Sequence, residues 1–129
     1  MKNHAISTPV GLLEGRDAIF LDGIQHDYKG RTVAFTGEIN ACLASKYEGA
    51  AEWLRYLIKF TGVDAISMTE LDCYEYELNL ASSFDRVAEP RLKSRIASCE
   101  QFVVATYDHV FELMATGYEF EITNERQAE

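Results

Sequence analysis

Four carboxylates crowd into a short stretch of the chain, with a tyrosine among them. They are Glu70, Asp72, Glu75 and Glu77, and the tyrosine is Tyr74. Because alternate side chains of a strand project to the same face, a strand here would place the first two carboxylates and Tyr74 together. A dense negative surface accelerates association with a basic protein, and an aromatic ring beside it supplies an apolar anchor. The five residues are therefore predicted to form a docking surface for a basic partner; the alternative is a solvated strand face.

Histidines with neighbouring carboxylates offer a second kind of chemistry, acid–base or metal-assisted hydrolysis. His109 follows Asp108 and precedes Glu112, and His26 precedes Asp27. His109 and Glu112 would share a face only on a helix, whereas on a strand they would point to opposite faces. A metal site needs three or four converging ligands, and these residues have no His-Glu-x-x-His spacing. A small hydrolase or metal-dependent enzyme is thus a third hypothesis, weaker than a structural role for these histidines.

The motifs that usually indicate enzymes and cofactor sites are absent from the sequence. There is no glycine-rich phosphate loop, no serine in a Gly-x-Ser-x-Gly context and no Cys-x-x-Cys pair. The three cysteines, Cys42, Cys73 and Cys99, are odd in number and far apart, which favours a reducing compartment such as the cytoplasm. We therefore expect no catalytic residues, no cofactor and no bound metal, and the sequence leans away from an enzyme.

The charge balance narrows the class of partner. The chain has 12 Lys and Arg against 21 Asp and Glu, for a formal net charge of −9, and most of the acidic excess lies in residues 65–129. Nucleic acid and anionic membrane surfaces are bound through basic side chains, so neither is expected as a partner. The apolar runs are far shorter than the ~20 residues that a membrane-spanning helix needs, and the N-terminus shows no signal-peptide pattern.

Aromatic residues are abundant, with seven Tyr, seven Phe and one Trp. Rings at alternating strand positions usually fill a core, because they bury the most area per residue. A cupped sheet lined by such rings could instead hold a small apolar molecule. A small-molecule-binding β domain with an aromatic-lined pocket is therefore the second functional hypothesis.

The elements that must position these residues are mostly strands. Residues 18–28 and 31–40 alternate apolar and polar side chains around a turn at Lys29-Gly30, which predicts an antiparallel hairpin. The next stretch has two interpretations, and we predict a strand over residues 55–61 rather than a helix over 46–59.

Residues 65–76 are rich in β-branched and aromatic side chains, so they are predicted to pair with 55–61 as a second hairpin.

One helix is predicted over residues 90–98, because a proline lies at its start and apolar residues follow with helical spacing. Its basic neighbours are expected on the wet side; they are Arg86, Arg91, Lys93 and Arg95. Residues 102–115 fit one long strand or two strands with a bend near Asp108, with a helix over 107–114 as the alternative. Residues 118–122 alternate as a final strand.

Together these elements predict an α+β fold in a single domain over residues 1–129. It is mostly antiparallel sheet, open or barrel-like, with one or two short helices. Residues 1–16 are expected to form a loose lead-in and 124–129 a frayed tail. For function we predict a small acidic binding protein, such as a bacterial immunity protein that inhibits a basic nuclease toxin. A nuclease presents a basic cleft to phosphate, and an acidic protein can occupy that cleft.

Overall fold

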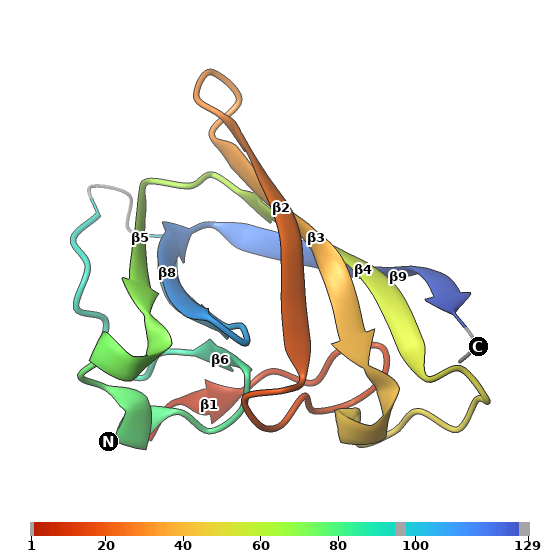
Figure 1. The fold of residues 1–129 in the computed structure, drawn as a ribbon. Coiled ribbons are helices and arrows are strands. Elements are labelled where there is room, and N and C mark those ends of the chain that lie inside the picture. Colours follow the sequence, from red (N-terminus) through yellow and green to blue (C-terminus); the bar gives the residue numbers. More distant parts are fainter. Residues whose placement is uncertain (1, 95–97, 127–129) are drawn as a thin grey trace.

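Two antiparallel sheets pack against each other in the computed structural model, which describes residues 2–94 and 98–126 (Figure 1). The first sheet has the order β1-β6-β7-β8-β5, with bounds β1 His4–Ala5, β6 Phe84–Arg86, β7 Glu100–Ala105, β8 His109–Ala115 and β5 Ala65–Glu70. The second has the order β2-β3-β4-β9, with bounds β2 Ile19–Asp27, β3 Thr32–Asn40, β4 Trp53–Thr61 and β9 Gly117–Arg126. The predicted single domain of mostly antiparallel sheet is confirmed, and the two sheets do not close into a barrel.

Helical structure in the described residues is limited to three 3₁₀ turns, η1 (Ala41–Leu43), η2 (Leu71–Cys73) and η3 (Glu77–Asn79). The helical part of the expected α+β fold is therefore only these short turns. No helix within the described part of the chain has the length and apolar character needed to cross a membrane.

The hairpin of β2 and β3 confirms the first predicted pair of strands. Its turn is held by the side chain of Asp27, whose Oδ1 accepts hydrogen bonds from the amides of Lys29 at 3.1 Å and Gly30 at 3.0 Å. The tip of this hairpin projects away from the two sheets (Figure 1).

β4 confirms the strand predicted over residues 55–61, and the alternative helix over 46–59 is wrong. The predicted pairing of this strand with residues 65–76 is also wrong, because β4 pairs with β3 and β9 whereas β5 pairs with β8 in the other sheet. The chain changes sheet at Val63, which is buried and whose amide donates to Arg31 O at 2.8 Å. Because Val63 is buried, the chain crosses to the first sheet and does not turn back along β4.

β7 and β8 confirm the bend predicted near Asp108, so the single long strand and the helix over 107–114 are wrong. Thr106 holds the turn between the two strands. Its Oγ1 accepts a hydrogen bond from His109 N at 3.1 Å and donates one to His109 O at 2.9 Å.

β9 is longer than the strand predicted over residues 118–122. Its pairing with β4 extends to Arg126. Cross-strand hydrogen bonding therefore keeps residues 124–126 in the sheet, where a frayed tail was expected. Residues 127–129 lie outside the described part of the chain.

The helix predicted over residues 90–98 does not form in the described part of that segment; residues 95–97 lie outside it. The amides of Arg91 and Leu92 donate to the side-chain oxygen of Gln101 on β7, at 2.6 and 2.9 Å. These bonds tie the segment to the first sheet as an extended strap.

The core between the sheets is filled by aromatic rings. Phe35 and Phe60 of the second sheet meet Phe111 and Phe102 of the first, with ring centroids 5.1 and 5.6 Å apart. All four rings are buried. Because these rings pack against one another, they stabilise the fold and do not line the aromatic pocket that the second hypothesis requires.

Residues 2–16 pack against this core, although a loose lead-in was expected there. Ile6, Val10 and Leu13 are buried, and β1 adds a short strand to the first sheet. Burial of these apolar side chains removes them from water and fixes the segment in place.

A second, smaller apolar cluster covers the outer face of the first sheet. Val103, Ala105 and Val110 project into it from β7 and β8, and Leu71 and Tyr74 cover them. β8 is consequently buried on both faces over most of its length. The covering segment, residues 70–80, carries the candidate site.

Candidate binding site

Residues 70–80, called here the acidic segment, form the 3₁₀ turns η2 and η3. A strand was predicted to continue through 65–76, but β5 ends at Glu70. Leu71 and Tyr74 lie three residues apart, the spacing at which side chains of a 3₁₀ turn share a face. Both are buried against the first sheet. Burial at this spacing is incompatible with strand alternation, which explains the difference.

The structure separates the five residues predicted to form the docking surface. Glu70, Asp72, Glu75 and Glu77 are exposed. Tyr74 is only 6% exposed and belongs to the outer apolar cluster. It is therefore not an exposed aromatic anchor, because its ring holds the acidic segment onto the sheet.

A buried polar network beneath Tyr74 is centred on Glu112. The carboxylate accepts hydrogen bonds from Arg91 Nη2, at 2.7 Å, and from the side chain of Gln101. The same arginine nitrogen donates to the Tyr74 hydroxyl at 3.1 Å, and the guanidinium lies 3.6 Å from the ring centroid of Tyr76. Arg91, expected on the wet side of a helix, instead ties the acidic segment to β8.

Replacing Tyr74 by phenylalanine is expected to make the stability less sensitive to alkaline pH. Burial, reinforced by the negative charge of Glu112, raises the pKa of Tyr74 from 10.0 to about 12. The folded state thus keeps a proton that the unfolded chain loses near pH 10. The contribution of this proton to the free energy of unfolding is fully present below pH 10 and is lost as the pH rises toward 12.

The urea midpoint should therefore fall less between pH 9 and pH 11 in Tyr74→Phe than in the wild type. An equal fall in both proteins would contradict the assignment of a buried, neutral phenol.

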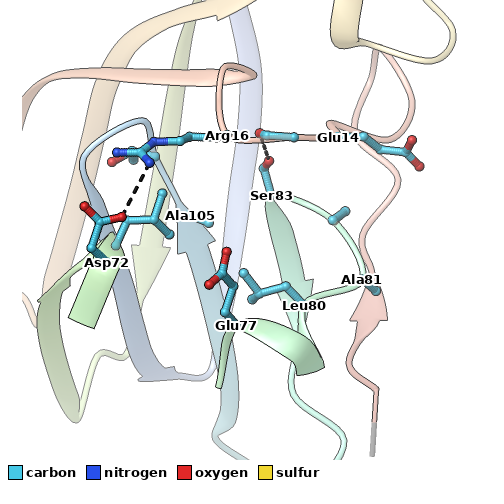
Figure 2. A pocket seen from close by; sticks show the side chains of 12 residues that line it. Glu14, Arg16, Asp72, Glu77, Leu80, Ala81, Ser83 and Ala105 are labelled. Carbon is cyan, nitrogen blue, oxygen red and sulfur yellow. Dashed lines mark hydrogen bonds and ion pairs between the residues drawn. The ribbon is translucent and has the colours of Figure 1, made fainter. Parts of the chain in front are cut away.

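A pocket of about 430 Å³ opens beside the acidic segment (Figure 2). Asp72 and Glu77 line it from the acidic segment, and Glu14 lines it from the N-terminal part of the chain. Apolar and hydroxyl side chains complete most of the wall; they are Leu71, Leu80, Ala81, Ala105, Ser82, Ser83 and Thr106. The described lining contains no aromatic ring, so this pocket differs from the one that the second hypothesis requires.

Arg16 brings a positive charge to the pocket. Its Nη1 lies 3.5 Å from Asp72 Oδ1 and its Nε donates to Tyr107 O at 3.1 Å. Both members of the ion pair are at least half exposed, so the pair adds little stability. Among the described residues, Glu14 and Glu77 make no ion pair. The pocket therefore keeps an excess of negative charge.

Asp85 fixes the back wall of the pocket. Its fully buried carboxylate accepts hydrogen bonds from the amide of Ala81 and the hydroxyl of Ser82, both at 2.7 Å. The Ser83 hydroxyl donates to Gly15 O at 2.8 Å, joining this wall to the loop that carries Glu14 and Arg16 (Figure 2). The walls are thus bonded to one another before any ligand binds.

The histidines of the enzyme hypothesis are not brought together with enough ligands for a metal site. His26 packs against Tyr28 at the tip of the first hairpin, with ring centroids 4.3 Å apart. His109 and Glu112 both lie on β8, at positions that project to opposite faces of a strand. Within the described residues, no three His, Cys, Asp or Glu side chains form a group that could hold a metal ion.

Sequence reasoning did not identify the N-terminal half of the pocket. Glu14 and Arg16 lie in the segment expected as a lead-in, and Arg16 meets Asp72 across 56 positions of sequence. Glycine at position 15 is a turn signal in the sequence, and Gly15 has a φ of 100° in the structure. No local pattern, however, indicates which distant segment such a turn will contact.

Comparison with known proteins gives no relative. No protein family model matches the chain, and no curated protein or solved structure matches it. The functional argument therefore rests on the acidic segment and the pocket beside it.

Proposed function

We propose that this chain is a small acidic binding protein that docks a basic protein over the acidic segment and its pocket. The observation that carries the proposal is that Asp72 and Glu77, from the acidic segment, line the same pocket as Glu14. The docking face comprises Glu14, Glu70, Asp72, Glu75, Glu77 and Leu78.

The docking face is held in place by buried contacts. Tyr74 packs in the outer apolar cluster, and Arg91 joins its hydroxyl to Glu112. A surface that needs no ordering loses less free energy when a partner binds. Its carboxylates attract a basic partner at long range, which raises the association rate and disfavours acidic partners.

An apolar contact is also available on the docking face. Leu78, the middle residue of η3, is 86% exposed, and it replaces Tyr74 as the candidate anchor. Tyr107 is 41% exposed, and the guanidinium of the pocket residue Arg16 lies over its ring, 5.2 Å from the centroid. Apolar side chains surrounded by charges are typical of binding surfaces, where the charges orient the partner and the apolar groups slow its release.

The class of partner that best fits this surface is a protein with a basic cleft. A nuclease has such a cleft because it binds phosphate, and an acidic protein that fills it blocks the enzyme. We therefore propose an inhibitor of the immunity type, acting in the bacterial cytoplasm on a nuclease toxin.

The proposal is tested by capturing a partner and then measuring its binding as a pure protein. The immobilised chain is exposed to lysate of the source organism, and the product of the neighbouring gene is expressed for comparison. A basic protein that binds one to one, and whose nuclease activity falls on binding, supports the proposal. Stable binding only to acidic or neutral proteins contradicts it.

Charge reversal on the docking face is expected to slow association with that partner. Glu70→Lys/Glu75→Lys changes two exposed carboxylates that do not line the pocket. We expect the association rate constant to fall roughly tenfold at low salt, because steering by complementary charge is removed. Stopped-flow or biosensor kinetics measure this rate.

The matched control is Glu119→Lys/Glu121→Lys, which makes the same change in charge on exposed positions of β9 in the other sheet. It should slow association far less. Equal slowing by both variants would show that net charge alone matters and that the docking face is placed wrongly.

A further inference from the structure

We infer that the pocket receives a single arginine side chain from the basic partner. This inference rests on the proposed function and identifies the contact that would give the complex its affinity. It also assigns the pocket a ligand of defined chemistry, a guanidinium group carried on an apolar stem.

The apolar part of the pocket suits the stem of such a side chain. Leu71, Leu80 and Ala105 line it, and long basic side chains bury their methylene groups against apolar surface while the charged head reaches a polar partner. The volume of about 430 Å³ lies within the range of roughly 300–1,000 Å³ usual for ligand sites. It leaves room for part of the flanking backbone as well.

The polar part of the pocket suits a cation. Glu14 and Glu77 line it without an ion pair among the described residues, and they come from different segments of the chain (Figure 2). Arg16 does not oppose a second cation strongly, because Asp72 and the Tyr107 carbonyl already contact it.

The hydroxyl groups of the wall already have partners, which leaves the carboxylates to select the ligand. Ser82 donates to Asp85, Ser83 to Gly15 O and Thr106 to His109 O. A guanidinium is favoured over an ammonium at such a site, because it is less strongly hydrated and its planar fork can donate two parallel hydrogen bonds to one carboxylate.

The inference is tested on the full chain with a small probe, the tripeptide N-acetyl-Gly-Arg-Gly-amide. In a titration followed by ¹⁵N-resolved NMR, the amides of Gly15, Ala81 and Ser83 should shift saturably, with an affinity in the millimolar range, as expected for one side chain. The citrulline analogue has nearly the same shape without the charge and should bind at least tenfold more weakly. Equal binding of both peptides, or no shift at these amides, overturns the inference.

Two variants test whether the arginine peptide binds within the pocket. Glu14→Gln/Glu77→Gln removes both unpaired carboxylates and should weaken the arginine peptide at least tenfold. Glu75→Gln, in the same segment but outside the pocket lining, should leave its affinity within twofold. Unchanged binding to the double variant overturns the inference, and the citrulline comparison on the wild-type chain stands even if that variant folds poorly.

The peptide and the whole partner distinguish this inference from the proposed function. If Glu70→Lys/Glu75→Lys slows the partner but the arginine peptide does not bind, docking stands and the arginine pocket is wrong. If the peptide binds but the charge reversals leave partner association unchanged, the pocket binds a guanidinium group and the proposed docking face is wrong.

Discussion

Replacing Gly37 by alanine is expected to lower the free energy of unfolding by about 3 kcal/mol, a large effect for one methyl group. A Cβ atom at Gly37 would lie 1.9 Å from Phe20 O and 3.0 Å from Asp22 N. Both are backbone atoms of β2, so they cannot rotate away. β2 has a register shift between Leu21 and Gly23 opposite this position, and glycine in a strand often marks such a close approach.

The matched control lies in the same hairpin. A Cβ atom at Gly23 would meet only Thr36 Oγ1, at 3.7 Å, which is an ordinary contact. Gly23→Ala should therefore change stability by less than about 1 kcal/mol and is more often favourable in a strand. Urea unfolding of both variants measures the difference, and similar midpoints would contradict the close packing of β2 on β3.

Replacing Arg91 by alanine is expected to cost about 3 kcal/mol, because it leaves the carboxylate of Glu112 buried without its cation. The side chains of this pair are 23% and 10% exposed, and the two charged groups are 2.7 Å apart. The substitution also removes the hydrogen bond to Tyr74 and the stacking on Tyr76, so it should loosen the acidic segment.

Two further variants separate the buried charge from the lost packing. Arg91→Leu/Glu112→Leu removes both charges, and it should be more stable than Arg91→Ala, because no unpaired carboxylate remains. Arg86→Ala breaks an ion pair with Glu100 whose side chains are 40% and 49% exposed, and it should cost less than about 1 kcal/mol. Chemical denaturation compares all three; equal losses would show that burial of the Arg91 pair is unimportant.

The strands could be predicted because alternation of apolar and polar residues records which face of a strand meets the core. The hairpin around Lys29-Gly30 is an example, since a local turn joins two alternating runs. The partner of β5 could not be predicted in this way. Its pairing with β8 joins residues far apart in sequence, and alternation alone does not specify which strand is adjacent.

The acidic segment shows a second limit of local pattern. Its four carboxylates are exposed. Strand alternation predicts that Tyr74 shares their surface, but Tyr74 is buried. The spacing of Leu71 and Tyr74 also fits a 3₁₀ turn. The turn forms, and not a strand, because the outer face of β7 and β8 buries both side chains.

The strap after β6 differs from the predicted helix for a related reason. Helical spacing of the apolar residues predicts a helix, but the segment is held instead by the buried Gln101, whose side chain accepts hydrogen bonds from Arg91 N and Leu92 N. A bond between a side chain and a distant backbone depends on tertiary structure and leaves no periodic signal in the sequence.

The central claim is that charge on the docking face steers a basic partner to this protein. Its most direct test is the association rate constant of the captured partner, measured over a salt series for the wild type and for Glu70→Lys/Glu75→Lys. Because salt screens exposed charges, the wild-type rate should fall as salt rises, and the roughly tenfold gap to the variant at low salt should close. A wild-type rate that does not change with salt, or a variant as fast as the wild type at low salt, would contradict the claim.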